Sequence, residues 1–223
     1  GYYLGLRYSG LLMIEFISLI KFFHLIVGVF FTSSGSAILN QYIESDLDAK
    51  MDRTKKRPVP SGKINPKKAF IFGFLLSIIG IFYLYFTISF LVSFLSFLTV
   101  FSYIVVYTPL KKKTSLNTLV GAIPGALPPV GGWFAANTET SSIVVALFAM
   151  LFCWQIPHFL ALAYMYSEDY KKGGFVMLPS LYSNQIQTRI HMLFFTLLLL
   201  FITFYLYMIK VTGIIYLFGA IIL

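Results

Sequence analysis

Charged residues are scarce in this chain. Asp, Glu, Lys and Arg make up only 11% of its 223 residues, whereas soluble domains carry about 25%. The mean hydropathy of +0.83 and the 58% share of hydrophobic residues agree with this scarcity. These values exclude an ordinary soluble domain and predict an integral membrane protein that sits in a lipid bilayer.

Cysteine is almost absent as well. Cys153 is the single cysteine, which excludes an internal disulfide and a cysteine-rich metal site. It lies in an apolar run without basic neighbours, so we expect it to pack rather than to act as a nucleophile.

The chain shows neither an initial Met nor a recognisable cleavable signal. We therefore expect residues 1–223 to be a single transmembrane domain that is truncated at both ends.

Apolar stretches of membrane-spanning length follow one another along the chain. They cover residues 17–39, 69–89, 90–108, 116–136, 143–166 and 192–209. A last stretch, 211–223, stops after about half of the ~20 residues that a crossing needs. Residues 1–10 are expected to form a short connection. The glycine- and proline-rich sequence GAIPGALPPVGGW requires neighbouring helices that protect its backbone. The predicted fold is an all-α, polytopic transmembrane helix bundle.

The charges are distributed unevenly over the connections. Those after the first, third and fifth stretches hold 14 of the 17 Lys and Arg residues. By the positive-inside rule these connections face the cytoplasm or its organellar equivalent. They also hold six of the eight Asp and Glu residues, which the rule does not explain. A solvated loop that meets anionic lipid accounts for the cations but not for the acids. Nucleic-acid binding is excluded, because the interspersed acids would repel a phosphate backbone.

The densest cluster of charge is the sequence NQYIESDLDAKMDRTKKRPVPSG, which starts at Asn40. Asn40, Glu44 and Asp48 are spaced four residues apart, so on a helix they drift by only ~80° and share one face. A row of oxygen ligands suits Mg²⁺, which proteins hold with one or two carboxylates together with substrate phosphates. We expect Asp52 to continue this row and Asp46 to point away from it.

Basic residues follow the acids directly. Arg53 and Arg57, with Lys55 and Lys56 between them, are suited to charge-assisted hydrogen bonds with phosphate oxygens. The prolines at positions 58 and 60, followed by Ser-Gly, are expected to end the helix. The pattern predicts a metal–diphosphate site at the membrane surface.

Two further clusters lie on the same side of the membrane. Lys111, Lys112 and Lys113 are either determinants of topology or include one lysine that reaches the diphosphate. Glu168 and Asp169 are candidates for a second metal contact from the opposite part of the bundle.

Polar residues also occur within the apolar stretches. His158 lies in the sequence WQIPHF, and intramembrane polar residues of this kind usually face the protein interior. It is a candidate haem ligand, proton carrier or hydrogen-bonded packing residue. His24 is a weaker candidate of the same type, and Lys21 one turn earlier is expected to extend towards the interface.

The cluster that starts at Asn40 resembles the first acidic motif of the UbiA superfamily of intramembrane prenyltransferases. That motif reads Asn-x-x-x-Asp/Glu-x-x-x-Asp and is followed by Arg-Thr-x-x-Arg-Pro. Three more sequences resemble the branch of this superfamily that farnesylates haem: YTPLKKKTSLNTLVGAIPGALPPVGGW (107–133), WQIPHFLALA (154–163) and EDYKKGGFVMLP (168–179). The resemblance implies an all-α fold of nine helices, of which about seven are present here, with the site opening at the cytoplasmic face.

The resemblance also implies roles for individual residues. Asn40, Glu44 and Asp48 would bind Mg²⁺ and, through it, farnesyl diphosphate. Arg53, Arg57 and one lysine of 111–113 would clamp the diphosphate. Asp169, together with Glu168, would stand for the second acidic motif and contact the metal. The sequence departs from the wider superfamily here, because Met165 and Gly173 occupy the positions where a second acid is usual.

The implied reaction converts haem B into haem O for the assembly of haem–copper oxidases. Implied partners are haem A synthase or assembly factors of a terminal oxidase. The implied location is the plasma membrane of a bacterium or archaeon, or the mitochondrial inner membrane of a eukaryote. For His158 the resemblance implies importance without a role. Alternatives are a UbiA-type enzyme that prenylates an aromatic quinone precursor, a non-catalytic haem carrier, and a secondary transporter in which GAIPGALPP breaks a helix.

Overall fold

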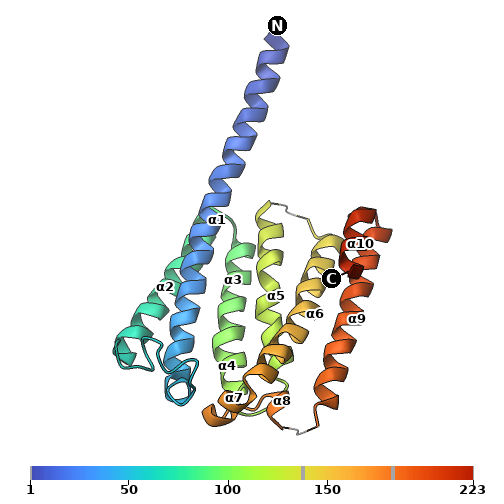
Figure 1. The fold of residues 1–223 in the computed structure, drawn as a ribbon. Coiled ribbons are helices and arrows are strands. Elements are labelled where there is room, and N and C mark those ends of the chain that lie inside the picture. Colours follow the sequence, from blue (N-terminus) through green and yellow to red (C-terminus); the bar gives the residue numbers. More distant parts are fainter. Residues whose placement is uncertain (1, 137–138, 182–183, 223) are drawn as a thin grey trace.

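The computed structural model describes residues 2–136, 139–181 and 184–222, with side chains from residue 19 onward except at 221. Regular structure in these ranges is entirely helical (Figure 1). Six of the described helices are long and apolar enough to cross a membrane, which confirms the predicted transmembrane bundle. The spanning segments are Leu19–Asp48, Pro66–Thr87, Phe90–Leu110, Asn117–Ala136, Ser142–Met165 and Ile186–Met208.

The helices follow the predicted order with some changes of boundary. They are α1 (Tyr2–Asp48), α2 (Pro66–Thr87), α3 (Phe90–Phe101), η1 (Ser102–Tyr107), α4 (Thr108–Leu110), α5 (Asn117–Ala136), α6 (Ser142–Met165), α7 (Ser167–Gly173), α8 (Leu178–Leu181), α9 (Ile186–Met208) and α10 (Ile214–Ile222). The expected connection at residues 1–10 is wrong over residues 2–10, which belong to α1. The short α10 matches the incomplete last span, and α7 is a helix where only a polar connection was predicted.

Helix α1 ends at Asp48, ten residues before the prolines that were expected to stop it. The Oγ1 of Thr54 donates a hydrogen bond to the carbonyl of Asp48 at 2.9 Å, which satisfies one of the acceptors left open at the helix end. Met51 is fully buried, so the chain turns inward immediately after the helix. The expectation that Asp52 continues the row of acids is therefore wrong, because Asp52 lies in the turns that follow.

Close packing of α1 on α2 depends on small residues. A Cβ atom at Gly35 would come within 2.7 Å of the carbonyl oxygen of Gly73 on α2, so only glycine fits there. The second and third spans form a tight hairpin. Ser89 begins α3 by accepting a hydrogen bond from the backbone N–H of Val92, one residue after the C-cap of α2.

The third span changes to a π-helix over Ser102–Tyr107. Pro109 lacks an N–H and its ring would clash with the carbonyl of Val105, which favours a wider turn at this point. By contrast, α5 runs unbroken through Pro124, Pro128 and Pro129. The transporter alternative, which required a broken helix there, is not supported.

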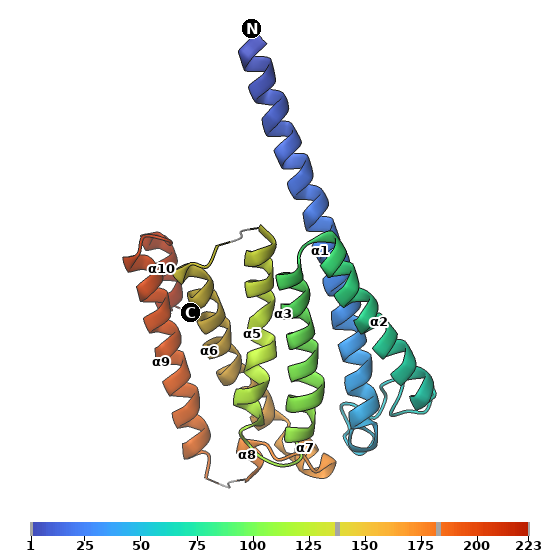
Figure 2. The same cartoon turned by 180° about the vertical axis from the view of Figure 1, so that it is seen from behind.

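The six spanning helices lie side by side, and the charged connections gather at one end of the bundle (Figures 1 and 2). The turns after α1 lie at this end together with α4, α7 and α8. The connections also bond to one another, since the backbone N–H of Val176 donates to the carbonyl of Lys111 at 2.7 Å. The acid and base clusters predicted to share one side of the membrane thus share one end of the fold.

Candidate active site

The row of acids faces a cavity of about 290 Å³ at the charged end of the bundle. Asn40, Glu44 and Asp48 all line it, and their exposed fractions are only 7%, 3% and 2%. Asp46, in contrast, is exposed. The spacing of four residues thus predicted the shared face correctly, because the last turns of α1 are regular helix.

Three cations line the same cavity as the two carboxylates. Lys111 Nζ lies 2.8 Å from Glu44 Oε1, and Arg57 Nη1 donates to Asp48 Oδ2 at 2.7 Å. Arg53 is the third cation in the lining. The lining therefore carries a formal net charge of +1, which favours an anionic ligand. Of the three consecutive lysines, Lys111 is the one that lines the cavity, whereas Lys112 and Lys113 are exposed.

Two tyrosines that the sequence reasoning missed complete this wall. Tyr103 donates through its hydroxyl to Asn40 Oδ1 at 2.9 Å, and the ammonium of Lys111 lies 4.5 Å from the ring centroid of Tyr107. Gly121 on α5 leaves room for the Tyr107 ring, which a side chain at that position would strike. Tyr103, Tyr107 and Lys111 are spaced four residues apart, the same signal that identified the acids.

Several polar atoms in the cavity are buried without a hydrogen-bond partner among the residues that the structure describes. Asn40 Nδ2 and Thr118 Oγ1 are among them. Glu44 Oε1, by contrast, has the ammonium of Lys111 at 2.8 Å. Thr118 lies on α5, across the cavity from the acids, and is 4% exposed. Buried polar groups usually find a partner, so these atoms are suited to contact a ligand.

The oxygen donors of this cavity fit a hard divalent cation. Asn40, Glu44 and Asp48 offer amide and carboxylate oxygens from one helix face, as Mg²⁺ prefers. Among the described residues, no three His, Cys, Asp or Glu side chains gather closely enough to form a metal site by themselves. These three side chains fit a divalent cation, which would need further oxygen ligands to complete its coordination.

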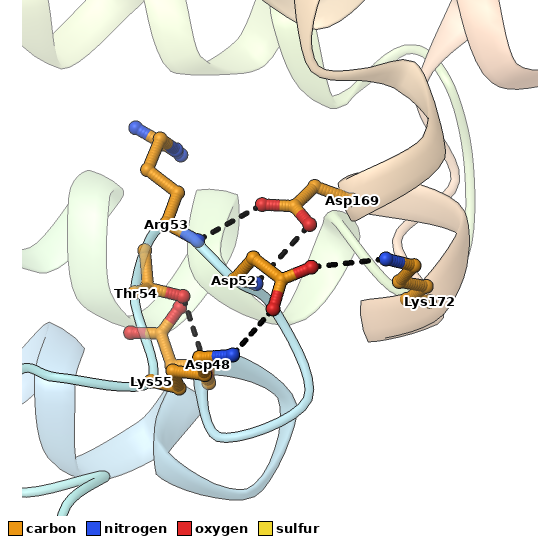
Figure 3. Close-up of polar contacts among 7 residues, drawn as sticks. All are labelled: Asp48, Asp52, Arg53, Thr54, Lys55, Asp169 and Lys172. Atoms are coloured by element: carbon orange, nitrogen blue, oxygen red, sulfur yellow. Dashed lines mark hydrogen bonds and ion pairs between the residues drawn. The ribbon is translucent and has the colours of Figure 1, made fainter.

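Asp169 holds the loop that follows α1 (Figure 3). Its carboxylate oxygens accept hydrogen bonds from the backbone N–H groups of Asp52 and Arg53, at 3.1 and 3.0 Å. Both carboxylate oxygens of Asp169 are therefore directed at the loop. Glu168 is exposed and pairs with Lys171 on its own helix.

The side chain of Asp52 points to two lysines outside the cavity. It pairs with Lys55 and, across to α7, with Lys172 at 3.0 Å. The Lys55 ammonium and then that of Lys172 lower the pKa of the Asp52 carboxyl to about 2. Because the folded pKa lies below the ordinary value of 3.8, this pairing is present at neutral pH and is lost as pH falls from about 4 to about 2.

His158 lies on an exposed face of α6, not in the cavity. Its ring stacks on that of Trp154, with centroids 5.0 Å apart and planes at 10°. The expectation that it faces the protein interior is wrong for the described residues. His24 contacts the neighbouring helix, since its Nδ1 lies 2.6 Å from the hydroxyl of Tyr83 on α2.

A second cavity of about 210 Å³ continues away from the charged end. Its lining is predominantly apolar and comes from α1, α2, α3 and α5. Ser36 lines this cavity one helical turn from Asn40, so the two cavities adjoin along α1. From Asn40 to Val29 the lining extends about 16 Å along the axis of α1. A polar head site and an apolar slot thus follow one another between the helices.

Known proteins resemble this chain over most of its length. The UbiA prenyltransferase family matches residues 9–223. Curated relatives include a "Protoheme IX farnesyltransferase" of Solibacter usitatus, 38% identical over 100% of this chain and 77% of the relative. Proteins of the same name from Sorangium cellulosum and Flavobacterium psychrophilum are 37% and 41% identical, over 89% and 81% of this chain and 70% and 58% of those proteins.

Two solved structures share the fold. One is a UbiA homologue from Aeropyrum pernix K1 in its apo form, with a TM-score of 0.74 and 17% identity over 92% of this chain and 76% of the other. The other is a digeranylgeranylglyceryl phosphate synthase, with a TM-score of 0.71 and 19% identity over 92% of this chain and 75% of the other. At these identities the likeness concerns the fold alone.

Proposed function

Because this chain belongs to the UbiA prenyltransferase family, we propose that it transfers a farnesyl group from farnesyl diphosphate to a vinyl group of haem B. The product is haem O, the precursor required by haem–copper oxidases. The relatives' name, borne at 38% identity over the whole chain, supports the choice of substrates. The observation that carries the chemistry is the polar cavity, in which two carboxylates and three cations adjoin an apolar slot.

Breaking the allylic C–O bond leaves negative charge on the diphosphate, and the cavity is built to receive it. Lys111 and Arg57 are within reach of both the carboxylates and a ligand in the cavity. Arg53 presents a third positive charge from the loop. Fixed charges in a site with little water stabilise a leaving group better than solvent does.

We assign the metal to Asn40, Glu44 and Asp48. A bound Mg²⁺ would neutralise charge on the diphosphate oxygens and so assist their departure. The Tyr103 hydroxyl donates to one lone pair of Asn40 Oδ1 and fixes the amide, so the second lone pair of this oxygen would meet the metal and Nδ2 would donate to a phosphate oxygen. The aromatic rings of Tyr103 and Tyr107 close one side of the cavity and offer cation–π stabilisation to an allylic cation.

For haem we assign the side of the bundle that carries His158. The stacked pair of Trp154 and His158 is exposed and flat, and the next residue, Phe159, lines the polar cavity. A planar macrocycle held against this pair would lie on the same helix, α6, that contributes Phe159 to the cavity lining. Positive charge around the cavity end supports an orientation with that end at the cytoplasmic or matrix face.

The proposal is tested by supplying haem B and farnesyl diphosphate to membranes that contain the protein. Haem O is expected in the extracted pigments when Mg²⁺ is present, and not when a chelator removes the divalent cation. Accumulation of haem B without conversion, in a protein that retains bound haem, would favour the carrier. Prenylation of an aromatic quinone precursor in place of haem would show that the prenyl acceptor is the quinone precursor and not haem B.

The apolar slot predicts a limit on chain length. Gly132 lines it, and a Cβ atom at this position meets no atom within 4 Å, so a larger side chain would fill the slot without a clash at its first carbon. Gly132→Leu is expected to lower kcat/KM for farnesyl diphosphate about tenfold and to spare geranyl diphosphate. Competition between the two diphosphates measures this ratio. An equal loss of kcat/KM with both diphosphates would show that the farnesyl chain does not bind in this slot.

Arg57→Lys tests the geometry of the diphosphate clamp. The planar guanidinium bonds Asp48 through Nη1 and keeps other N–H groups for a ligand, whereas an ammonium is a single point charge. We expect kcat/KM to fall about tenfold although the charge is kept. Steady-state kinetics with varied farnesyl diphosphate measure the change. Kinetics like those of the wild type would show that charge alone suffices.

A further inference from the structure

Asp169 joins two segments that are far apart in the chain. Its helix, α7, follows the fifth span, whereas Asp52 and Arg53 follow the first, a sequence separation of 117 and 116 residues. One oxygen accepts from each backbone N–H, so the carboxylate spans the peptide between the two residues (Figure 3). Hydrogen bonds of backbone N–H groups to a carboxylate are stronger than those between neutral groups.

The same helix, together with its N-cap residue Tyr166, also holds the side chain of Arg53. The guanidinium lies 5.1 Å from the ring centroid of Tyr166 and 5.7 Å from that of Tyr170. Its Nη2 donates to the hydroxyl of Tyr170 at 3.2 Å. Arg53 and Tyr170 both line the polar cavity, so the backbone contact and the cavity contact belong to one unit.

Other contacts limit what this loop can do. Met51 and Thr54, on either side of the clamped peptide, are each only 1% exposed. Lys172, one turn after Asp169, pairs with the side chain of Asp52 and provides a second tie between α7 and the loop. Between these buried residues, Asp52 and Arg53 are held to α7 by Asp169 and Lys172.

We propose that Asp169 is a positioning residue, which holds the peptide between Asp52 and Arg53 so that the Arg53 guanidinium stands at the mouth of the diphosphate cavity. It acts on the substrate through Arg53 and not as a direct ligand of the metal. The carboxylate of Asp169 binds the backbone of the loop, and this task needs only one acid. Met165 and Gly173 can therefore occupy the positions where the wider superfamily usually has a second acid. This inference rests on the proposed function, which supplies the diphosphate.

The first test needs no turnover. Asp169→Asn replaces one acceptor oxygen with an amide NH2 group, a donor that would face a backbone N–H donor, so the loop is expected to open more often. In membranes without substrate, tryptic cleavage after Arg53, Lys55 and Lys56 should accelerate about tenfold. Glu168→Gln changes the neighbouring exposed carboxylate and should leave cleavage as in the wild type. Unchanged cleavage in Asp169→Asn would overturn the proposal.

The second test uses kinetics. Asp169→Asn and Arg53→Ala are each expected to raise the KM for farnesyl diphosphate about tenfold, and the double variant no further than either one. The Mg²⁺ concentration for half-maximal rate should stay at the wild-type value in Asp169→Asn. A raised Mg²⁺ requirement, with effects that multiply in the double variant, would make Asp169 a metal ligand and overturn the proposal.

Two arms keep the tests decisive. If Asp169→Asn does not accumulate in the membrane, Lys172→Ala removes only the second tie and should increase cleavage and KM in the same direction by a smaller factor. No change in either quantity would overturn the proposal. If the wild-type protein transfers no prenyl group, the proposed function fails, and the cleavage rates still decide whether Asp169 holds the loop.

Discussion

Asp48→Asn is expected to abolish farnesyl transfer, with a fall in kcat of at least about a hundredfold. Asp48 is 2% exposed, lines the polar cavity and pairs with Arg57. The amide keeps the shape but removes the charge that would hold Mg²⁺ and orient the guanidinium. Because the partner Arg57 is partly exposed, it can be solvated, and the variant should still insert and bind haem. Haem O formation in isolated membranes measures the loss.

Asp46→Asn is the matched control for this variant. Asp46 lies on the same helix within one turn, carries the same charge and is exposed outside the cavity. It should retain the wild-type rate, so a loss confined to Asp48→Asn reports on the cavity and not on the charge of the helix end. Wild-type turnover in Asp48→Asn would show that the row of oxygens takes no part in the mechanism. Loss of haem binding in that variant would indicate that the row contacts haem and not the diphosphate.

Lys111→Gln is expected to lower kcat/KM about a hundredfold, whereas Lys112→Gln and Lys113→Gln should remain within about twofold of the wild type. The three lysines are adjacent in sequence, yet only the first lines the cavity among the described residues, at 13% side-chain exposure and 2.8 Å from Glu44. Kinetics of the three variants with farnesyl diphosphate measure the difference. Equal losses in all three would indicate a diffuse electrostatic effect.

The loss in Lys111→Gln must be separated from a loss of stability. Removing one partner of a buried ion pair costs about 3–5 kcal/mol, because the other charge is left alone. The double variant Glu44→Gln/Lys111→Gln leaves no buried charge at this pair and should regain thermal stability. We expect it to stay inactive, because both the metal ligand and the diphosphate contact are gone. Recovery of activity in the double variant would show that the pair is structural.

Much of the fold followed from composition and periodicity. Long apolar stretches must be helical in a membrane because every backbone polar group needs a partner within the segment, and this predicted the spanning helices. The end of α1 was not predictable in the same way. It depends on the burial of Met51 and the hydrogen bond from Thr54 to Asp48, both of which are tertiary contacts.

In the candidate site, too, some features follow from local helix geometry and others depend on tertiary contacts. Asn40, Glu44 and Asp48 share a face through helical geometry alone, so their spacing predicted the row correctly. Tyr103, Tyr107 and Lys111 carry the same spacing, but their direction depends on the π-helix and on the room that Gly121 leaves. His158 shows the limit of local rules, since its polarity suggested an interior position and the packing of α6 leaves it exposed.

By itself the amino-acid sequence determined that this is a helical membrane protein with one charged end and a row of oxygens on one helix face. These are consequences of hydrophobicity and of a repeat of 3.6 residues, which act within a single segment. Only the tertiary structure decided which lysine meets the acids and that Asp169 is directed at a loop. Those contacts join segments more than 60 residues apart, and local periodicity has no means of specifying which distant side chain arrives.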